Sequence, residues 1–71
     1  MSANTPLLSE LLGRIRGEYL EMPGLKLTLA QAQRLWGLDR TLCEAALAAL
    51  EEGRFLRRTL GGAFVRAEHA V

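Results

Sequence analysis

The sequence predicts one small α+β domain, mainly helical, with a β-hairpin near its C-terminal end. Three segments carry apolar residues at helical spacing, and each is bounded by capping or turn residues. Two short strand-like runs, separated by Gly61-Gly62, follow them. Of the 71 residues, 49% are hydrophobic and 24% are charged, which is the balance of a globular domain and too apolar for a disordered chain.

The first helix is predicted to begin at Thr5-Pro6 and to end near Glu21. Thr5 is a suitable N-cap, and Pro6 fits the first helical position, where a missing N–H costs nothing. Met22-Pro23-Gly24 ends the helix, since a proline disfavours helical backbone in the residue before it. Gly13 and Gly17 lie off the apolar stripe and allow two interpretations, a close-approach surface for another helix or tolerated surface glycines. The stripe expected to face the core consists of Leu8, Leu11, Leu12, Ile15, Tyr19 and Met22.

A short strand and a capped second helix are predicted next. Leu25-Lys26-Leu27 alternates apolar and polar residues over a length that suits only a short strand. Thr28 and Gln31 have the spacing of a capping box, in which the Thr28 hydroxyl accepts from the Gln31 amide and the Gln31 side chain reaches back. The helix runs to about Trp36 and ends at Gly37, a residue able to adopt the left-handed conformation. Its inner face is expected to carry Leu29, Ala32 and Trp36.

The third helix is predicted from Arg40 to about Glu52. Asp39 is a good N-cap, and Gly53 ends the helix. Because so short a turn joins the second and third helices, the two form a helix-turn-helix unit. The core-facing residues of the third helix are expected to be Cys43, Ala46, Leu47 and Leu50.

The hairpin is predicted from Phe55–Leu60 and Ala63–Arg66, with Gly61-Gly62 as a two-residue turn. In this register Arg57 lies opposite Arg66, and two opposed arginines are expected to face water or an anion. Residues 1–5 are expected to be a disordered N-terminus and residues 67–71 a short tail, with the domain at residues 6–66.

The composition argues against catalysis and against a membrane location. One cysteine, Cys43, and one histidine, His69, cannot supply a metal cluster or a supported nucleophile, so no enzyme activity, metal or cofactor is expected. The longest uninterrupted apolar run, Ala45–Leu50, is six residues, far below the roughly 20 that a membrane span needs. The start of the chain does not resemble a signal peptide, and a single cysteine suits a reducing compartment, so the expected location is the cytoplasm.

Positive charge is concentrated in the last quarter of the chain. Residues 1–53 carry five lysine or arginine residues against seven acidic ones, whereas residues 54–71 carry four arginines against one glutamate. Arginines on a hairpin can clamp phosphates or can simply solvate a strand edge and discourage aggregation, and both roles remain open.

The order of elements resembles that of a winged helix-turn-helix domain of the bacterial regulator type. The resemblance covers residues 6–66 and is carried by Thr28–Leu38, by Leu47, Leu50, Gly53 and Phe55–Arg58, and by Gly61, Gly62 and Phe64. In DNA-binding members, the third helix enters the major groove while the wing and the start of the second helix hold phosphates. Carried over, this implies a base-facing set of Arg40, Thr41, Glu44, Ala45 and Ala48. The implied phosphate contacts are Thr28, Gln31, Arg57, Arg58 and Arg66.

The outer face of the third helix departs from the DNA-binding pattern. Of the residue types that most often read base edges, it offers only Arg40. Two hypotheses therefore stand. In the first, the chain is a homodimeric protein that binds double-stranded DNA through its wing arginines, as a transcriptional regulator or accessory factor. In the second, it is a protein-protein interaction module or subunit that uses the alanine-rich third helix as its contact face.

Overall fold

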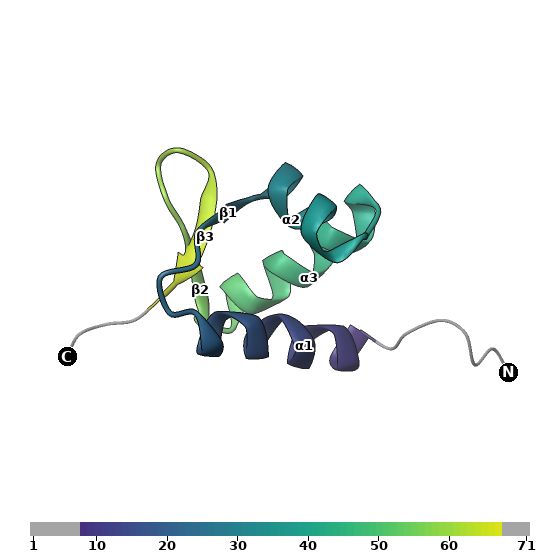
Figure 1. Ribbon diagram of the computed structural model, residues 1–71, viewed down its shortest axis with the longest axis horizontal. Helices are drawn as coiled ribbons and strands as arrows, with labels where there is room; N and C mark the ends of the chain where they lie inside the picture. The colour runs from purple at the N-terminus through teal and green to yellow at the C-terminus, as the bar shows by residue number, and fades with distance from the viewer. Residues whose placement is uncertain (1–7, 68–71) are drawn as a thin grey trace, which may run out of the picture.

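A computed structural model describes residues 8–67, which form three helices and a three-stranded antiparallel sheet (Figure 1). The predicted α+β class and its three helices are confirmed. The expected cap at Thr5-Pro6, the N-terminal segment and the tail with His69 lie outside the described residues, except for Ala67. The elements are α1 (Leu8–Glu21), β1 (Leu27–Thr28), α2 (Leu29–Trp36), α3 (Arg40–Glu52), β2 (Leu56–Arg58) and β3 (Ala63–Arg66).

The helices pack together, and the sheet lies at one end of them. Figure 1 shows α1 running below α3, with the sheet beside the C-terminal end of α1. The strand order is β1-β3-β2, so β3 is central and β2 is an edge strand. Tyr19 joins α1 to this sheet, because its hydroxyl donates to the Phe64 carbonyl oxygen at 2.9 Å.

The core is built from the inner faces that the periodicity predicted for α2 and α3 and for most of α1. The prediction for α1 is wrong at the two ends of its apolar stripe, since Leu8 and Met22 are 43% and 49% exposed. They lie at the first residue of α1 and just beyond its last, where the other elements do not cover them. The buried residues are Leu11, Ile15, Tyr19, Ala32, Trp36, Cys43, Ala46, Leu47, Leu50, Leu56, Ala63 and Phe64.

The local signals at the ends of α2 are confirmed. Thr28 Oγ1 accepts from the Gln31 amide at 3.2 Å, and Gln31 Oε1 accepts from the Thr28 amide at 2.9 Å. Gly37 ends α2 in the left-handed region, with φ at 64°. Asp39 then caps α3, because its Oδ1 accepts from the Leu42 amide at 2.8 Å. The residues between the two helices therefore specify both the C-terminal end of α2 and the N-terminal start of α3.

The C-terminal end of α3 uses a left-handed residue other than glycine. Gly53 follows the helix with φ at −78°, and it is Arg54 that adopts a φ of 66°. The Arg54 amide donates to the Glu51 carbonyl at 3.0 Å, and the Phe55 amide donates to the Leu50 carbonyl at 2.9 Å. These two bonds form a Schellman motif, in which Arg54 holds the position that glycine usually occupies.

Two strand predictions are corrected. The strand expected at Leu25-Lys26-Leu27 is displaced, because only Leu27 and Thr28 pair with β3. The hairpin register is shifted by one residue, so that Arg57 lies opposite Val65 and not opposite Arg66.

The cause of the register shift is a three-residue loop in place of the expected two-residue turn. The Thr59 amide donates to the Ala63 carbonyl at 2.7 Å, which closes the loop one residue earlier on the first strand. The Gly62 amide donates to the Thr59 carbonyl at 2.9 Å, and Gly62 takes the left-handed conformation with φ at 86°. This is the common geometry of a turn followed by a left-handed glycine.

Candidate functional site

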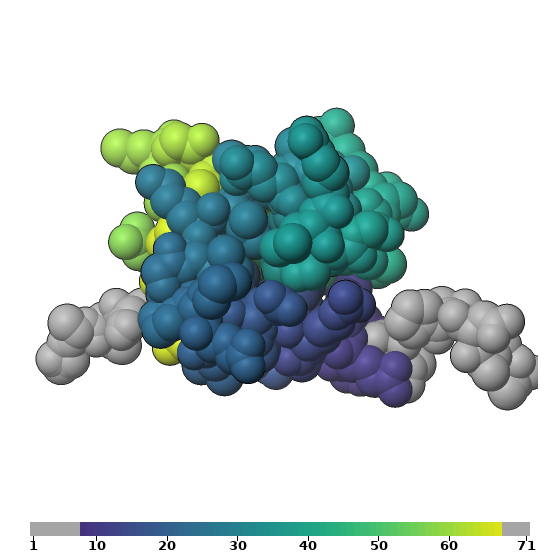
Figure 2. All heavy atoms as spheres, viewed as in Figure 1, coloured from purple at the N-terminus to yellow at the C-terminus, as the bar shows by residue number. Residues whose placement is uncertain are grey.

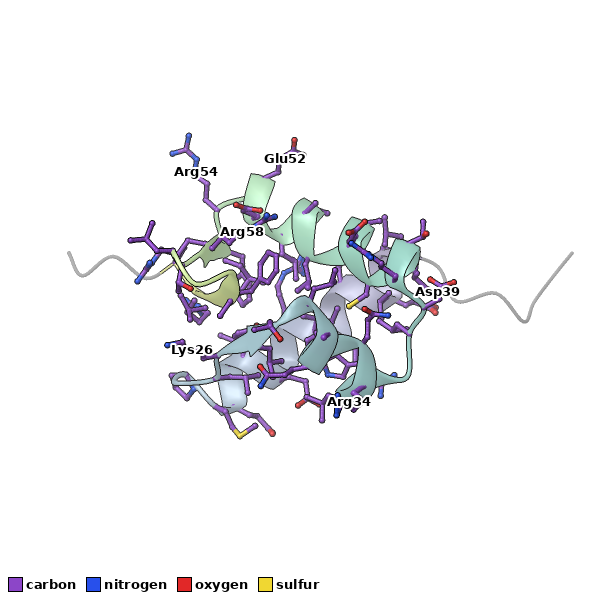
Figure 3. The ribbon with its side chains drawn as sticks, turned by 90° about the horizontal axis from the view of Figure 1, so that it is seen from above. Lys26, Arg34, Asp39, Glu52, Arg54 and Arg58 are labelled. Carbon is purple, nitrogen blue, oxygen red and sulfur yellow. The ribbon has the colours of Figure 1, made fainter. Side chains whose placement is uncertain are left out.

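A shallow hollow of about 300 Å³ lies between the hairpin, the start of α2 and the outward face of α3. It brings together three of the predicted site residues, Glu44 and Ala48 from α3 and Arg58 from the hairpin. Figure 3 shows Arg58 beside α3, in the space between that helix and the hairpin. The lining residues are Leu29, Glu44, Ala48, Arg58, Gly62 and Phe64.

Arg58 is held in place by two neighbours. Its Nη2 donates to Glu51 Oε1 at 3.1 Å, and its guanidinium carbon lies 4.8 Å from the centroid of the Phe64 ring. The side chains of Arg58 and Glu51 are 53% and 37% exposed, so the ion pair is a surface pair and contributes about 0–1 kcal/mol. The guanidinium is therefore directed toward α3, and a carboxylate of α3 already offsets its charge.

The three arginines of the hairpin strands, Arg57, Arg58 and Arg66, do not converge on one surface. Alternate residues of a strand face opposite sides of the sheet, so Arg57 lies on the other face from Arg58 and Arg66. Arg66 is at the far end of β3 from the loop, where its guanidinium carbon lies 4.5 Å from the centroid of the Phe55 ring. A phosphate clamp built from all three side chains would need them on one side, and the structure separates them.

The outward face of α3 carries small side chains and a bound ion pair. Arg40 Nε donates to Glu44 Oε2 at 3.3 Å, one helical turn along, with both side chains more than half exposed. Thr41, Ala45 and Ala48 are exposed on the same helix. The structure thus brings the predicted base-facing set onto one exposed face, but its single guanidinium is paired with a carboxylate.

Thr28 and Gln31, the remaining predicted phosphate contacts, lie at the start of α2. Both side chains are already bonded to backbone amides in the capping box. Their hydrogen-bonding capacity is thus used mainly to begin the helix.

Three exposed or partly exposed residues near the hairpin were missed by sequence reasoning. Glu51 is the partner of Arg58, a pairing across seven residues that no local pattern signals. No sequence pattern singles out Arg54, because the Gly53 before it is the residue type that usually ends a helix. Leu60 is fully exposed in the hairpin loop, and Figure 2 shows the tip of the hairpin standing clear of the rest of the surface. A three-residue loop assignment would have placed Leu60 there.

The two buried ionisable side chains belong to the core and not to this surface. Burial raises the pKa of Tyr19 from 10.0 to about 12, with a smaller contribution from Cys43. Burial also raises the pKa of the Cys43 thiol, and the nearby carboxylates of Glu44 and Asp39 add to that effect. Both groups are therefore neutral at pH 7, and Cys43 is a small apolar core residue.

Within residues 8–67 no cluster of three or more histidine, cysteine or acidic side chains is placed to hold a metal ion. Over the same stretch, none of the helices combines the length and apolar character needed to cross a membrane. Comparison of the chain with protein-family models, with curated proteins and with solved structures gave no match.

Proposed function

We propose that the chain is a winged helix-turn-helix module that acts as a protein-interaction unit and pairs with a second copy through the outward face of α3. The winged-helix assignment is supported by the order of the elements, by the tight turn at Gly37 between α2 and α3, and by the hairpin that returns to pair with β1. The function is argued from the surface, since winged helices serve both nucleic acid and protein partners.

The observation that carries the proposal is the chemistry of the α3 face. Its centre is occupied by Ala45 and Ala48, both exposed. Alanine at a contact allows two helices to approach to about 8 Å between their axes. The guanidinium groups beside these alanines, from Arg40 and Arg58, are both bound by carboxylates of α3 itself.

The charges along α3 favour a second copy as the partner. Arg40 stands at the N-terminal end of the helix, and Glu51 and Glu52 stand at its C-terminal end. If two copies pack antiparallel about a two-fold axis between Ala45 and Ala48, Arg40 of each copy lies beside the acidic end of the other. The same arrangement sets the two helix dipoles antiparallel.

The α3 face offers few groups that could bind duplex DNA. Glu44, Glu51 and Glu52 would stand near phosphates, and only Arg40 can make a bidentate contact to a base. On the side of α3 the hairpin supplies Arg58, already paired with Glu51, and Arg66, which lies over the Phe55 ring at the far end of β3 from the loop. A partner with both small apolar and oppositely charged groups fits this surface better.

The test is the mass of the full chain in solution, measured by sedimentation equilibrium over a range of concentrations. We expect the wild-type chain to reach the mass of a dimer, and Ala48→Glu to remain a monomer with unchanged circular dichroism. Ala30→Glu, an exposed alanine of α2, is the matched control and should dimerise as the wild type does. A wild-type chain that stays monomeric, or an Ala48→Glu variant that still dimerises, would overturn the proposal. A titration of labelled duplex DNA at low and moderate salt then shows whether salt-sensitive nucleic-acid binding takes its place.

A further inference from the structure

We propose that the free edge of β2 takes up an extended acidic segment of another polypeptide as an additional strand. This inference uses a surface separate from the centre of the α3 face and does not depend on self-pairing. It rests on the backbone groups of the edge, on an adjoining hollow and on two arginines beside it.

The edge of β2 presents free backbone groups. β2 pairs with β3 on one side only. The Thr59 amide donates to Ala63, and the Phe55 carbonyl accepts from the Ala67 amide, so these alternate residues point toward β3. In an antiparallel ladder the intervening residues, Leu56 and Arg58, then direct their N–H and C=O groups away from β3. Leu56 is only 1% exposed, whereas Arg58 is exposed, so an added strand can bond to the outward backbone groups of Arg58.

A hollow of about 500 Å³ adjoins this edge and can receive side chains of an added strand. Its lining is Glu51, Arg54, Leu56, Arg57 and Ala67. Glu51 is bound by Arg58, whereas Arg54 and Arg57 have no carboxylate within 4 Å among residues 8–67. The hollow therefore presents two exposed guanidinium groups that no carboxylate of residues 8–67 pairs with, and acidic side chains complement them.

Arg54 adopts a left-handed backbone conformation that is unfavourable for a residue with a side chain. Its φ of 66° costs about 1 kcal/mol for a residue with a Cβ, while the adjacent Gly53 is not the left-handed residue. The result is an arginine at the end of α3, and Figure 3 shows its side chain extended outward, on the opposite side of the molecule from Lys26 and Arg34. Such retained strain is found most often at binding and catalytic positions.

The charges argue against a second copy at this edge. Two β2 strands paired edge to edge would bring the arginines of both copies together, and like charges across a strand pair are destabilising. Charged side chains are also a common protection against such self-pairing. An acidic segment meets neither obstacle.

The probe for the experiment is a fluorescein-labelled heptapeptide of alternating glutamate and valine, titrated with the full chain and followed by fluorescence polarisation. We expect saturable binding, weakened about tenfold or more when Arg54→Glu and Arg57→Glu are combined. Arg34→Glu, an exposed arginine of α2, is the matched control and should leave the affinity unchanged. The same peptide with alternate amides N-methylated keeps its charge and loses its strand-pairing groups, so it should also bind about tenfold more weakly.

The backbone amide signal of Arg58, the exposed residue of this edge, should shift on peptide addition in an NMR titration. Circular dichroism of each variant establishes that a weaker affinity does not reflect unfolding. The proposal is overturned if the labelled peptide does not bind, if the N-methylated peptide binds equally well, or if Arg34→Glu weakens binding as much as the double variant. Tighter binding of a duplex DNA of equal charge would also overturn it and would assign the two arginines to phosphates.

Discussion

Replacing Gly13 and Gly17 by alanine should stabilise the protein. Both glycines lie inside α1. Among residues 8–67, apart from the adjacent residues and the backbone of the helix, no atom lies within 4 Å of the position that a Cβ would take at either glycine. Alanine in a helix interior is favoured over glycine by about 0.5–1 kcal/mol, because glycine loses more backbone freedom on folding. The double variant should therefore gain about 1–2 kcal/mol, equivalent to roughly 4–16 °C in the melting temperature of a domain this small.

The assay is urea unfolding followed by the fluorescence of Trp36, the only tryptophan and a core residue. Gly37→Ala is the matched control, since it too has open space around the added Cβ but has a φ of +64°. That variant should lose about 1 kcal/mol, because the left-handed conformation penalises a Cβ. If the Gly13 and Gly17 variants lose stability, or if they lower the mass of the protein in solution, the glycines contact another helix and the argument from open space is refuted.

Three further outcomes follow from the buried groups and from the end of α3. The pKa of Tyr19 is about 12 in the folded state and 10.0 in the unfolded state. The contribution of Tyr19 to the free energy of unfolding should therefore be complete below pH 10 and should decrease as the pH rises toward 12. Tyr19→Phe should remove this part of the pH dependence in parallel unfolding curves, and an undiminished alkaline loss would contradict the assignment. Cys43, buried and of raised pKa, should react with a thiol reagent only as fast as the protein opens, so immediate labelling of the folded chain would show that it is accessible. Arg54→Gly should raise the free energy of unfolding by about 1 kcal/mol in urea and should weaken the binding of the acidic peptide. A destabilised variant would mean that the Arg54 side chain packs as part of the fold.

The parts of the fold that depend on residues close together in the sequence were predicted correctly. The capping box of Thr28 and Gln31 and the left-handed Gly37 are local, and each formed as expected. The hairpin register was not predicted correctly, because Gly61-Gly62 suits a two-residue turn as well as it suits the three-residue loop that forms. The Thr59 hydroxyl decides the outcome by accepting from the Ala63 amide at 3.1 Å, which supports the longer loop.

The candidate site was less predictable, since its electrostatics depend on tertiary contacts. The sequence shows four arginines in the last quarter of the chain but does not show which carboxylates approach them. The pairing of Arg58 with Glu51 joins the hairpin to α3. The stacking of Arg66 on Phe55 keeps that guanidinium at the opposite end of β3 from the loop. Charge counted along the chain therefore overstated the cationic surface beside α3.

The most direct test of self-pairing through α3 is a charge exchange measured by sedimentation equilibrium. Arg40→Glu and Glu52→Arg each place a favourable charge at their own end of the helix dipole, so neither should unfold the chain. Each single variant should shift the protein toward monomer, because it opposes like charges across the antiparallel pair. The double variant should recover the dimer. Single variants that dimerise as the wild type does, or a double variant that stays monomeric, would contradict antiparallel pairing of the two α3 helices.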